Sequence, residues 1–68
     1  MSRRVVGVIT EVLPNDLYSV ELESGRTVVA HIAGKQRMNI VRLIPGDDVA
    51  VEISAFDRNK ARVLAKGS

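Results

Sequence analysis

Apolar and polar residues alternate one by one in several short segments of this sequence, a period typical of β-strands that bury one face. The alternation is clearest in residues 18–23, 49–54 and 60–66. Residues 5–13 form a β-branched run without strict alternation, in which Gly7 indicates a bulge or a close backbone approach. Residues 26–32 follow a tight turn and are predicted to return as the second strand of a hairpin. The sequence therefore predicts five short strands.

Residues that favour turns separate these strands, namely Pro14-Asn15-Asp16, Ser24-Gly25 and Pro45-Gly46-Asp47-Asp48. Residues 36–44 do not alternate, and we expect a loop and one or two helical turns there. Five strands with a short helix between the third and fourth is the order of the oligonucleotide-binding fold, an all-β Greek-key barrel. An SH3-like barrel also has five short strands, but the expected helix favours the oligonucleotide-binding fold. Strand parity predicts a core of Val20, Leu22, Ile32, Val49, Val51, Ile53 and Val63.

A chain of 68 residues has room for one domain, and we assign residues 1–68 to a single barrel with flexible ends at 1–4 and 67–68. Cysteine is absent and His31 is the only histidine, so neither disulfides nor a zinc site can stabilise the domain. No apolar run reaches the roughly 18 residues that a membrane-spanning helix needs, and the chain does not start like a signal peptide. We expect a cytoplasmic protein without membrane contact.

Basic and acidic residues are separated along the chain, although the net charge is only +2. Residues 24–46 and 58–68 contain no carboxylate and hold eight of the ten Lys and Arg residues. All eight carboxylates fall in residues 11–23 and 47–57. This pattern predicts a positive face opposite a negative one, and it favours contact with a nucleic acid over a solvated surface.

The sequence contains no pattern of residues that is typical of a catalytic site. There is no nucleophile elbow, phosphate-cradling glycine loop or metal-ligand cluster. Asp47 and Asp48 follow Pro45-Gly46, where acids are ordinary turn formers. We expect no enzymatic activity, no catalytic residue and no bound metal or cofactor.

Tyr18 and Phe56 are the only aromatic residues, and both are candidates for base stacking. Tyr18 shares its face with Val20 and Leu22, which favours a place in the core. Phe56 lies between the last two predicted strands with only Ala55 as an apolar neighbour, so packing and stacking both remain open. His31 either contacts a nucleotide or simply occupies a sheet surface, and its position alone favours the latter.

Residues 34–39 combine a glycine with two cations and two amides, groups that suit a phosphate and a base edge or ribose. The last predicted strand adds a basic face. Because aromatic residues are few, the pattern favours phosphate contacts and shape over base reading. The candidate RNA-binding residues of the loop and this strand are Lys35, Arg37, Asn39, Arg42, Lys60, Arg62 and Lys66, the last three on one face.

One block of the sequence is distinctive, namely His31-Ile32-Ala33-Gly34-Lys35 followed by Arg37 and Asn39, and then Pro45-Gly46-Asp47. It is accompanied by Gly7, Leu13-Pro14-Asn15, Val20-Glu21-Leu22, Ala30, Arg42, Val49, Val51-Glu52 and Asp57. With these residues at these spacings, the sequence over residues 5–66 resembles the family of bacterial translation initiation factor one. The chain departs from the family at Ile40 and Ala65, where members usually carry an aromatic residue.

The resemblance implies a barrel that binds ribosomal RNA at the decoding (A) site of the small ribosomal subunit. There it would occupy the aminoacyl-tRNA position, act with the other initiation factors, and be a monomer off the ribosome. The positions implied to face RNA are His31, Lys35, Arg37, Asn39, Arg42, Lys60 and Arg62, with Phe56 and Lys66 as further candidates. The alternatives are a general single-stranded nucleic-acid binder or RNA chaperone, and an adaptor whose basic face meets an acidic protein.

Overall fold

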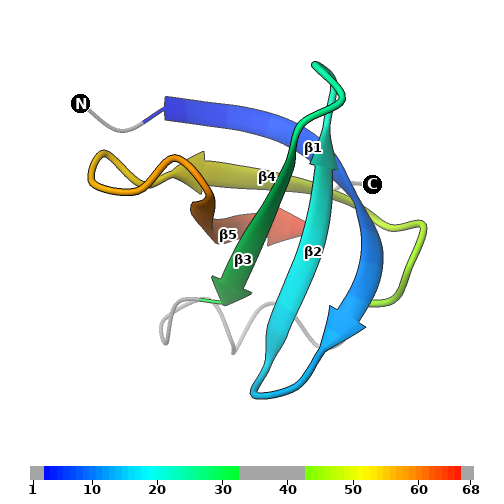
Figure 1. Ribbon diagram of the computed structural model, residues 1–68. Helices are drawn as coiled ribbons and strands as arrows, with labels where there is room; N and C mark the ends of the chain where they lie inside the picture. The colour runs from blue at the N-terminus through cyan, green and yellow to red at the C-terminus, as the bar shows by residue number, and fades with distance from the viewer. Residues whose placement is uncertain (1–2, 33–42, 67–68) are drawn as a thin grey trace.

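The computed structural model describes residues 3–32 and 43–66, and within these ranges the chain forms a closed barrel of five strands (Figure 1). The strands are β1 (Arg3–Leu13), β2 (Leu17–Leu22), β3 (Thr27–Ile32), β4 (Asp48–Ile53) and β5 (Lys60–Lys66). Their order around the barrel is β1-β2-β3-β5-β4, and β4 closes onto β1. Only β3 and β5 pair in parallel among these described strands. The predicted all-β, five-stranded barrel is confirmed, whereas the short helix expected within residues 36–44 falls mainly on residues outside the described ranges.

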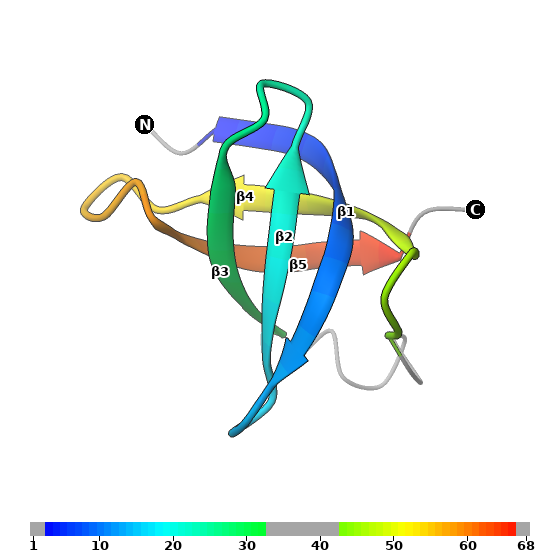
Figure 2. The same cartoon turned by 45° about the vertical axis from the view of Figure 1, so that its right-hand side comes forward.

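β1 belongs to both sides of the barrel. Figure 2 shows that β1 is strongly curved, and its first half pairs with β4 while its second half pairs with β2. Gly7 lies at the change-over and pairs with Leu22 on one side and Val49 on the other. A Cβ atom at this position would lie 2.6 Å from Cγ1 of Val20 and 2.8 Å from the carbonyl oxygen of Glu21. Glycine is therefore required at this close approach, as its place in the β-branched run suggested.

The predicted turns are present and depend on left-handed backbone conformations. Asn15 and Asp16 have φ angles of 62° and 60°, and Gly46 has a φ of 98°. The turn around Gly46 is fixed to β1, because its N–H donates to the carbonyl of Ile9 at 2.8 Å and the N–H of Ile9 donates to the carbonyl of Asp47 at 2.9 Å. These bonds set where β4 begins.

The inward-facing residues of all five strands fill the barrel with aliphatic side chains. Of the predicted core, Val20, Val49, Val51 and Val63 are fully buried. Leu22, Ile32 and Ile53 are partly buried and pack against the core, as does Tyr18. Strand parity thus identified core residues correctly but not how deeply each is buried. The other buried hydrophobic side chains in the described part of the chain are Ile9, Val28, Ala30, Leu43 and Ala61.

A register shift in β5 changes which side chains share a face. Val63 lies opposite Val51, but Ala65 lies opposite Ala50, so Leu64 is an extra residue in the ladder. A bulge of this kind reverses the alternation beyond it. The prediction that Lys60, Arg62 and Lys66 lie on one face is therefore wrong for Lys66.

Candidate nucleic-acid interface

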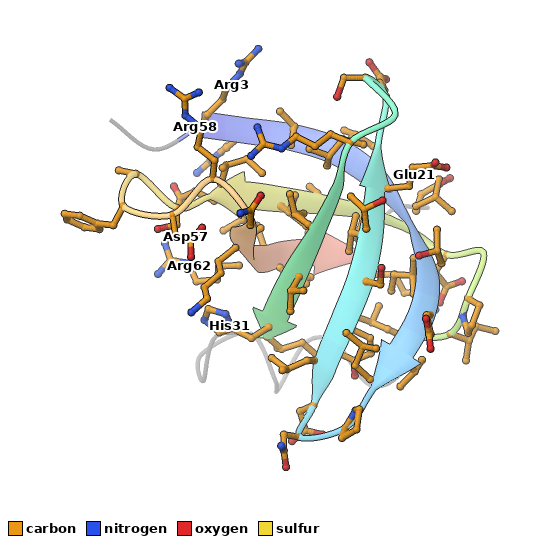
Figure 3. All side chains as sticks on the ribbon, in the orientation of Figure 1. Arg3, Glu21, His31, Asp57, Arg58 and Arg62 are labelled. Carbon is orange, nitrogen blue, oxygen red and sulfur yellow. The ribbon has the colours of Figure 1, made fainter. Side chains whose placement is uncertain are left out.

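Four of the candidate RNA-binding residues surround one surface hollow of about 390 Å³. The parallel pairing of β3 with β5 places His31 opposite Arg62, and both side chains face outward because Ala30, Ala61 and Val63 face the core. Lys60 comes from the start of β5, and Phe56 comes from the β4–β5 loop. Figure 3 shows His31 and Arg62 on the same side of the barrel. Residues far apart in the sequence thus form one surface.

Arg62 is oriented by a carboxylate on the neighbouring strand. It lies opposite Glu52 of β4, and its Nη2 group donates a hydrogen bond to Oε1 of Glu52. The Arg62 side chain is 49% exposed, so the pair is open to solvent. A guanidinium carries five donors in a fixed fork, which leaves donors for a phosphate after this contact. Glu52 thus lowers the net charge of the hollow while it limits the directions that Arg62 can take.

Phe56 is fully exposed in the β4–β5 loop, so its side chain has no part in packing the barrel. The Ser54 hydroxyl oxygen accepts hydrogen bonds from the N–H groups of Phe56 and Asp57, at 3.1 and 3.2 Å. The end of the loop is held because the N–H of Lys60 donates to the carbonyl of Asp57 at 3.0 Å. A fixed backbone that presents a bare aromatic ring beside cations suits base stacking. The sequence left two roles for Phe56, core packing and base stacking, and its full exposure excludes core packing.

The other predicted site residues are placed elsewhere or not described. Lys66 lies at the far end of β5, where its Nζ is 3.5 Å from Oδ2 of Asp47, and it does not line the hollow. The positions that lie outside the described residues are Lys35, Arg37, Asn39 and Arg42. Within residues 3–32 and 43–66 no three potential metal ligands are grouped, and no helix there is long and apolar enough to cross a membrane.

The predicted separation of charge into two faces holds only in part. In Figure 3, His31, Arg58 and Arg62 lie on one side of the barrel and Glu21 lies on the other. Asp57 lies on the basic side, and Glu52 lines the same hollow as Arg62. Sequence reasoning missed Glu52 as a site residue. Alternation shows that it faces outward, but its contact with Arg62 depends on the register of β4 against β5.

Comparison with known proteins identifies the family of this barrel. The family model described as translation initiation factor 1A / IF-1 (eIF-1a) matches residues 2–67. The solution structure of translation initiation factor one from the Wolbachia endosymbiont strain TRS of Brugia malayi is similar, with a TM-score of 0.79 and 32% identity over 98% of this chain and 79% of that chain. The crystal structure of YjeQ from Thermotoga maritima has a TM-score of 0.75 and 18% identity over 97% of this chain and 23% of that chain, a similarity of fold alone.

The family match confirms both the expected oligonucleotide-binding barrel and the resemblance to initiation factor one. It also confirms that the protein is not an enzyme, because the family consists of non-enzymatic translation factors. This chain belongs to the translation initiation factor 1A / IF-1 family.

Proposed function

We propose that this protein binds ribosomal RNA of the small ribosomal subunit at the decoding site and sterically occupies the aminoacyl-tRNA position, acting with the other initiation factors. It does so as a cytoplasmic monomer whose single domain spans residues 1–68. The observation that carries the proposal is the hollow in which His31, Phe56, Lys60 and Arg62 converge in a member of this family. Two cations and an exposed ring supply the phosphate contacts and the stacking surface that single-stranded or looped RNA requires.

Arg62 and Lys66 form a matched pair for testing the site. Both lie in β5, both contact a carboxylate, and their side chains are 49% and 47% exposed. Arg62→Gln should weaken binding to purified small subunits by at least a few fold in a fluorescence titration at fixed salt, because it removes a charge-assisted contact. Lys66→Gln removes the same charge outside the hollow and should leave the affinity unchanged. Equal losses in both variants would mean that only net charge matters, and no loss in either would contradict the site.

The position on the subunit needs a separate measurement. Chemical probing of the small-subunit RNA should show protection of decoding-site nucleotides when the wild-type protein is added, and weaker protection with Arg62→Gln. Binding of the protein should also displace a labelled tRNA anticodon stem-loop from the aminoacyl-tRNA position. Protection at another site without displacement would contradict steric occupation.

The same titration separates this function from general single-strand binding. Sequence-tolerant strand binders stack successive bases on several aromatic residues, and this chain has only Tyr18, which packs against the core, and Phe56. We therefore expect weaker binding to a random single-stranded RNA than to the small subunit. Equal affinity for both would favour the RNA chaperone.

A further inference from the structure

A second, larger groove lies at the end of the barrel where β1 begins. Its volume is about 870 Å³, and its walls come from the start of β1, the β2–β3 turn and the β4–β5 loop. The cations among the described residues that line it are Arg3, Arg4, Arg26 and Arg58. Figure 3 shows Arg3 and Arg58 together at this end. None of these arginines lines the hollow that contains His31. We call this feature the arginine groove.

The arginine groove concentrates positive charge. Among its described lining residues Glu23 is the only carboxylate, so four arginines and one glutamate give a formal charge of +3. The whole chain carries only +2, so the rest of the molecule sums to about −1. Like charges gathered around one groove repel each other, and this arrangement favours an anionic ligand.

The guanidinium groups of the arginine groove are largely available. Arg26 is oriented by Asn59, to which its Nη2 group donates a hydrogen bond of 3.2 Å. Arg3, Arg4 and Arg58 are exposed, and no hydrogen bond or ion pair joins their side chains to another residue within 3–32 or 43–66. Their planar forks match the oxygens of a phosphate in bidentate geometry, which a lysine does not.

We propose that the arginine groove binds the phosphate backbone of RNA, as a second contact distinct from the hollow around His31. The proposal rests on the RNA-binding function proposed above. No aromatic ring is among the described residues that line the groove, so it offers no surface for base stacking, whereas its guanidinium groups suit phosphate oxygens. Ile53, Ser54 and Ala55 line both cavities. The two contacts therefore flank one segment of chain, and RNA held in the hollow passes close to the groove.

Two double variants separate the groove from the hollow. Arg3→Gln/Arg58→Gln changes the arginine groove alone, and Lys60→Gln/Arg62→Gln changes the hollow alone. Each removes two positive charges from exposed positions, so net charge is matched. The probes are purified small ribosomal subunits and a fluorescein-labelled RNA duplex of about 16 base pairs, roughly the length that a small RNA-binding domain spans. Melting curves recorded by circular dichroism confirm that both variants fold.

Salt dependence gives the expected size of the effect. Each phosphate contact contributes about −0.7 to −0.9 to the slope of log affinity against log salt, so two lost contacts reduce the slope by about 1.4 to 1.8. Between roughly 50 and 200 mM salt, wild-type affinity for the subunit should therefore fall about 7- to 12-fold more than that of the groove variant. We also expect the groove variant to bind the duplex several fold more weakly than wild type at the lower salt concentration.

The outcomes distinguish the two proposals. Wild-type affinity and slope in the groove variant, with a loss in the hollow variant, would overturn the arginine groove and leave the proposed function standing. If neither the wild type nor any variant bound the subunit, the proposed function would be wrong. Weaker binding of the duplex by the groove variant than by the wild type would still support the arginine groove. Displacement of the duplex from the wild type by unlabelled duplex supports RNA as the ligand. Displacement by polyglutamate alone would show that the ligand is an acidic protein segment and overturn the proposal.

Discussion

Gly7→Ala is the change that tests most directly how β1 is shared between two sides of the barrel. The new methyl group would lie 2.6 Å from Cγ1 of Val20, 2.8 Å from the carbonyl oxygen of Glu21 and 3.2 Å from Cδ2 of Leu22. Val20 is fully buried, and the Glu21 carbonyl is part of a strand paired on both sides. Neither neighbour can withdraw without moving β2 away from β1.

The size of the effect follows from two opposing contributions. An extra methyl group in a well-packed interior destabilises by about 1–3 kcal/mol. Alanine also lowers the conformational entropy of the unfolded chain, which by itself raises the free energy of unfolding by about 0.4–1 kcal/mol. The centres of the two ranges, about 2 and about 0.7 kcal/mol, give a net loss of about 1.3 kcal/mol in the free energy of unfolding. A domain of this size loses about 4–8 °C in Tm for each kcal/mol, so we expect the Tm of Gly7→Ala to fall by roughly 5–10 °C.

Thermal melts followed by far-UV circular dichroism measure this shift, and Val20→Ala supplies a double-mutant cycle. Removing Cγ1 of Val20 relieves the shortest contact, so the double variant should be less destabilised than the sum of the two single variants. Strict additivity would show that the methyl group does not press on Val20. A Tm equal to or above that of wild type in Gly7→Ala would refute the claim that this approach requires glycine.

Five other substitutions have defined outcomes. Val51→Ala removes two methyl groups from a fully buried site and should lower the free energy of unfolding by about 1–3 kcal/mol, measured as a lower urea midpoint. Gly46→Ala meets no atom within 4 Å but keeps a φ of 98°, so a loss of about 1–2 kcal/mol in the same assay would come from the backbone alone. Phe56→Ala should leave the Tm unchanged and weaken subunit binding, because the ring is fully exposed; a lower Tm would give the ring a structural role. Arg37→Ala and Arg42→Ala should each weaken subunit binding by a few fold with unchanged melting curves, and wild-type affinity in both would exclude them from the interface.

The strands, the turns and most of the core could be predicted because they depend on local patterns. Period-2 alternation in β2 and β4 and the Pro-Gly and Ser-Gly turns are read within a few residues of sequence. The extra residue Leu64 could not be predicted in this way, because a bulge is defined by the partner strand. The wrong face assigned to Lys66 follows from that single residue.

Sequence alone named His31, Phe56, Lys60 and Arg62 as candidates, but it did not show that they converge with Glu52 on one hollow, because that depends on how the strands pair. His31 and Arg62 were recognised from the family resemblance and the charge pattern, but nothing local shows that they lie opposite each other. Arg26 and Arg58 lie in the two segments without carboxylates, so the sequence predicted that they belong to basic regions. Their meeting with Arg3 at one end of the barrel depends on the β4–β5 loop and the β2–β3 turn lying next to the start of β1.

The parallel pairing of β3 with β5 has a kinetic consequence. The β2–β3 hairpin joins neighbouring segments, whereas β3–β5 and β1–β4 join segments far apart in the chain, and contacts of that kind form slowly because a long loop must be ordered first. His31 is part of the early hairpin, but Arg62 reaches it only when the barrel closes. In a stopped-flow refolding experiment, the ability to bind RNA should therefore return with the slowest folding phase that buries the core, and not with the first strands that form.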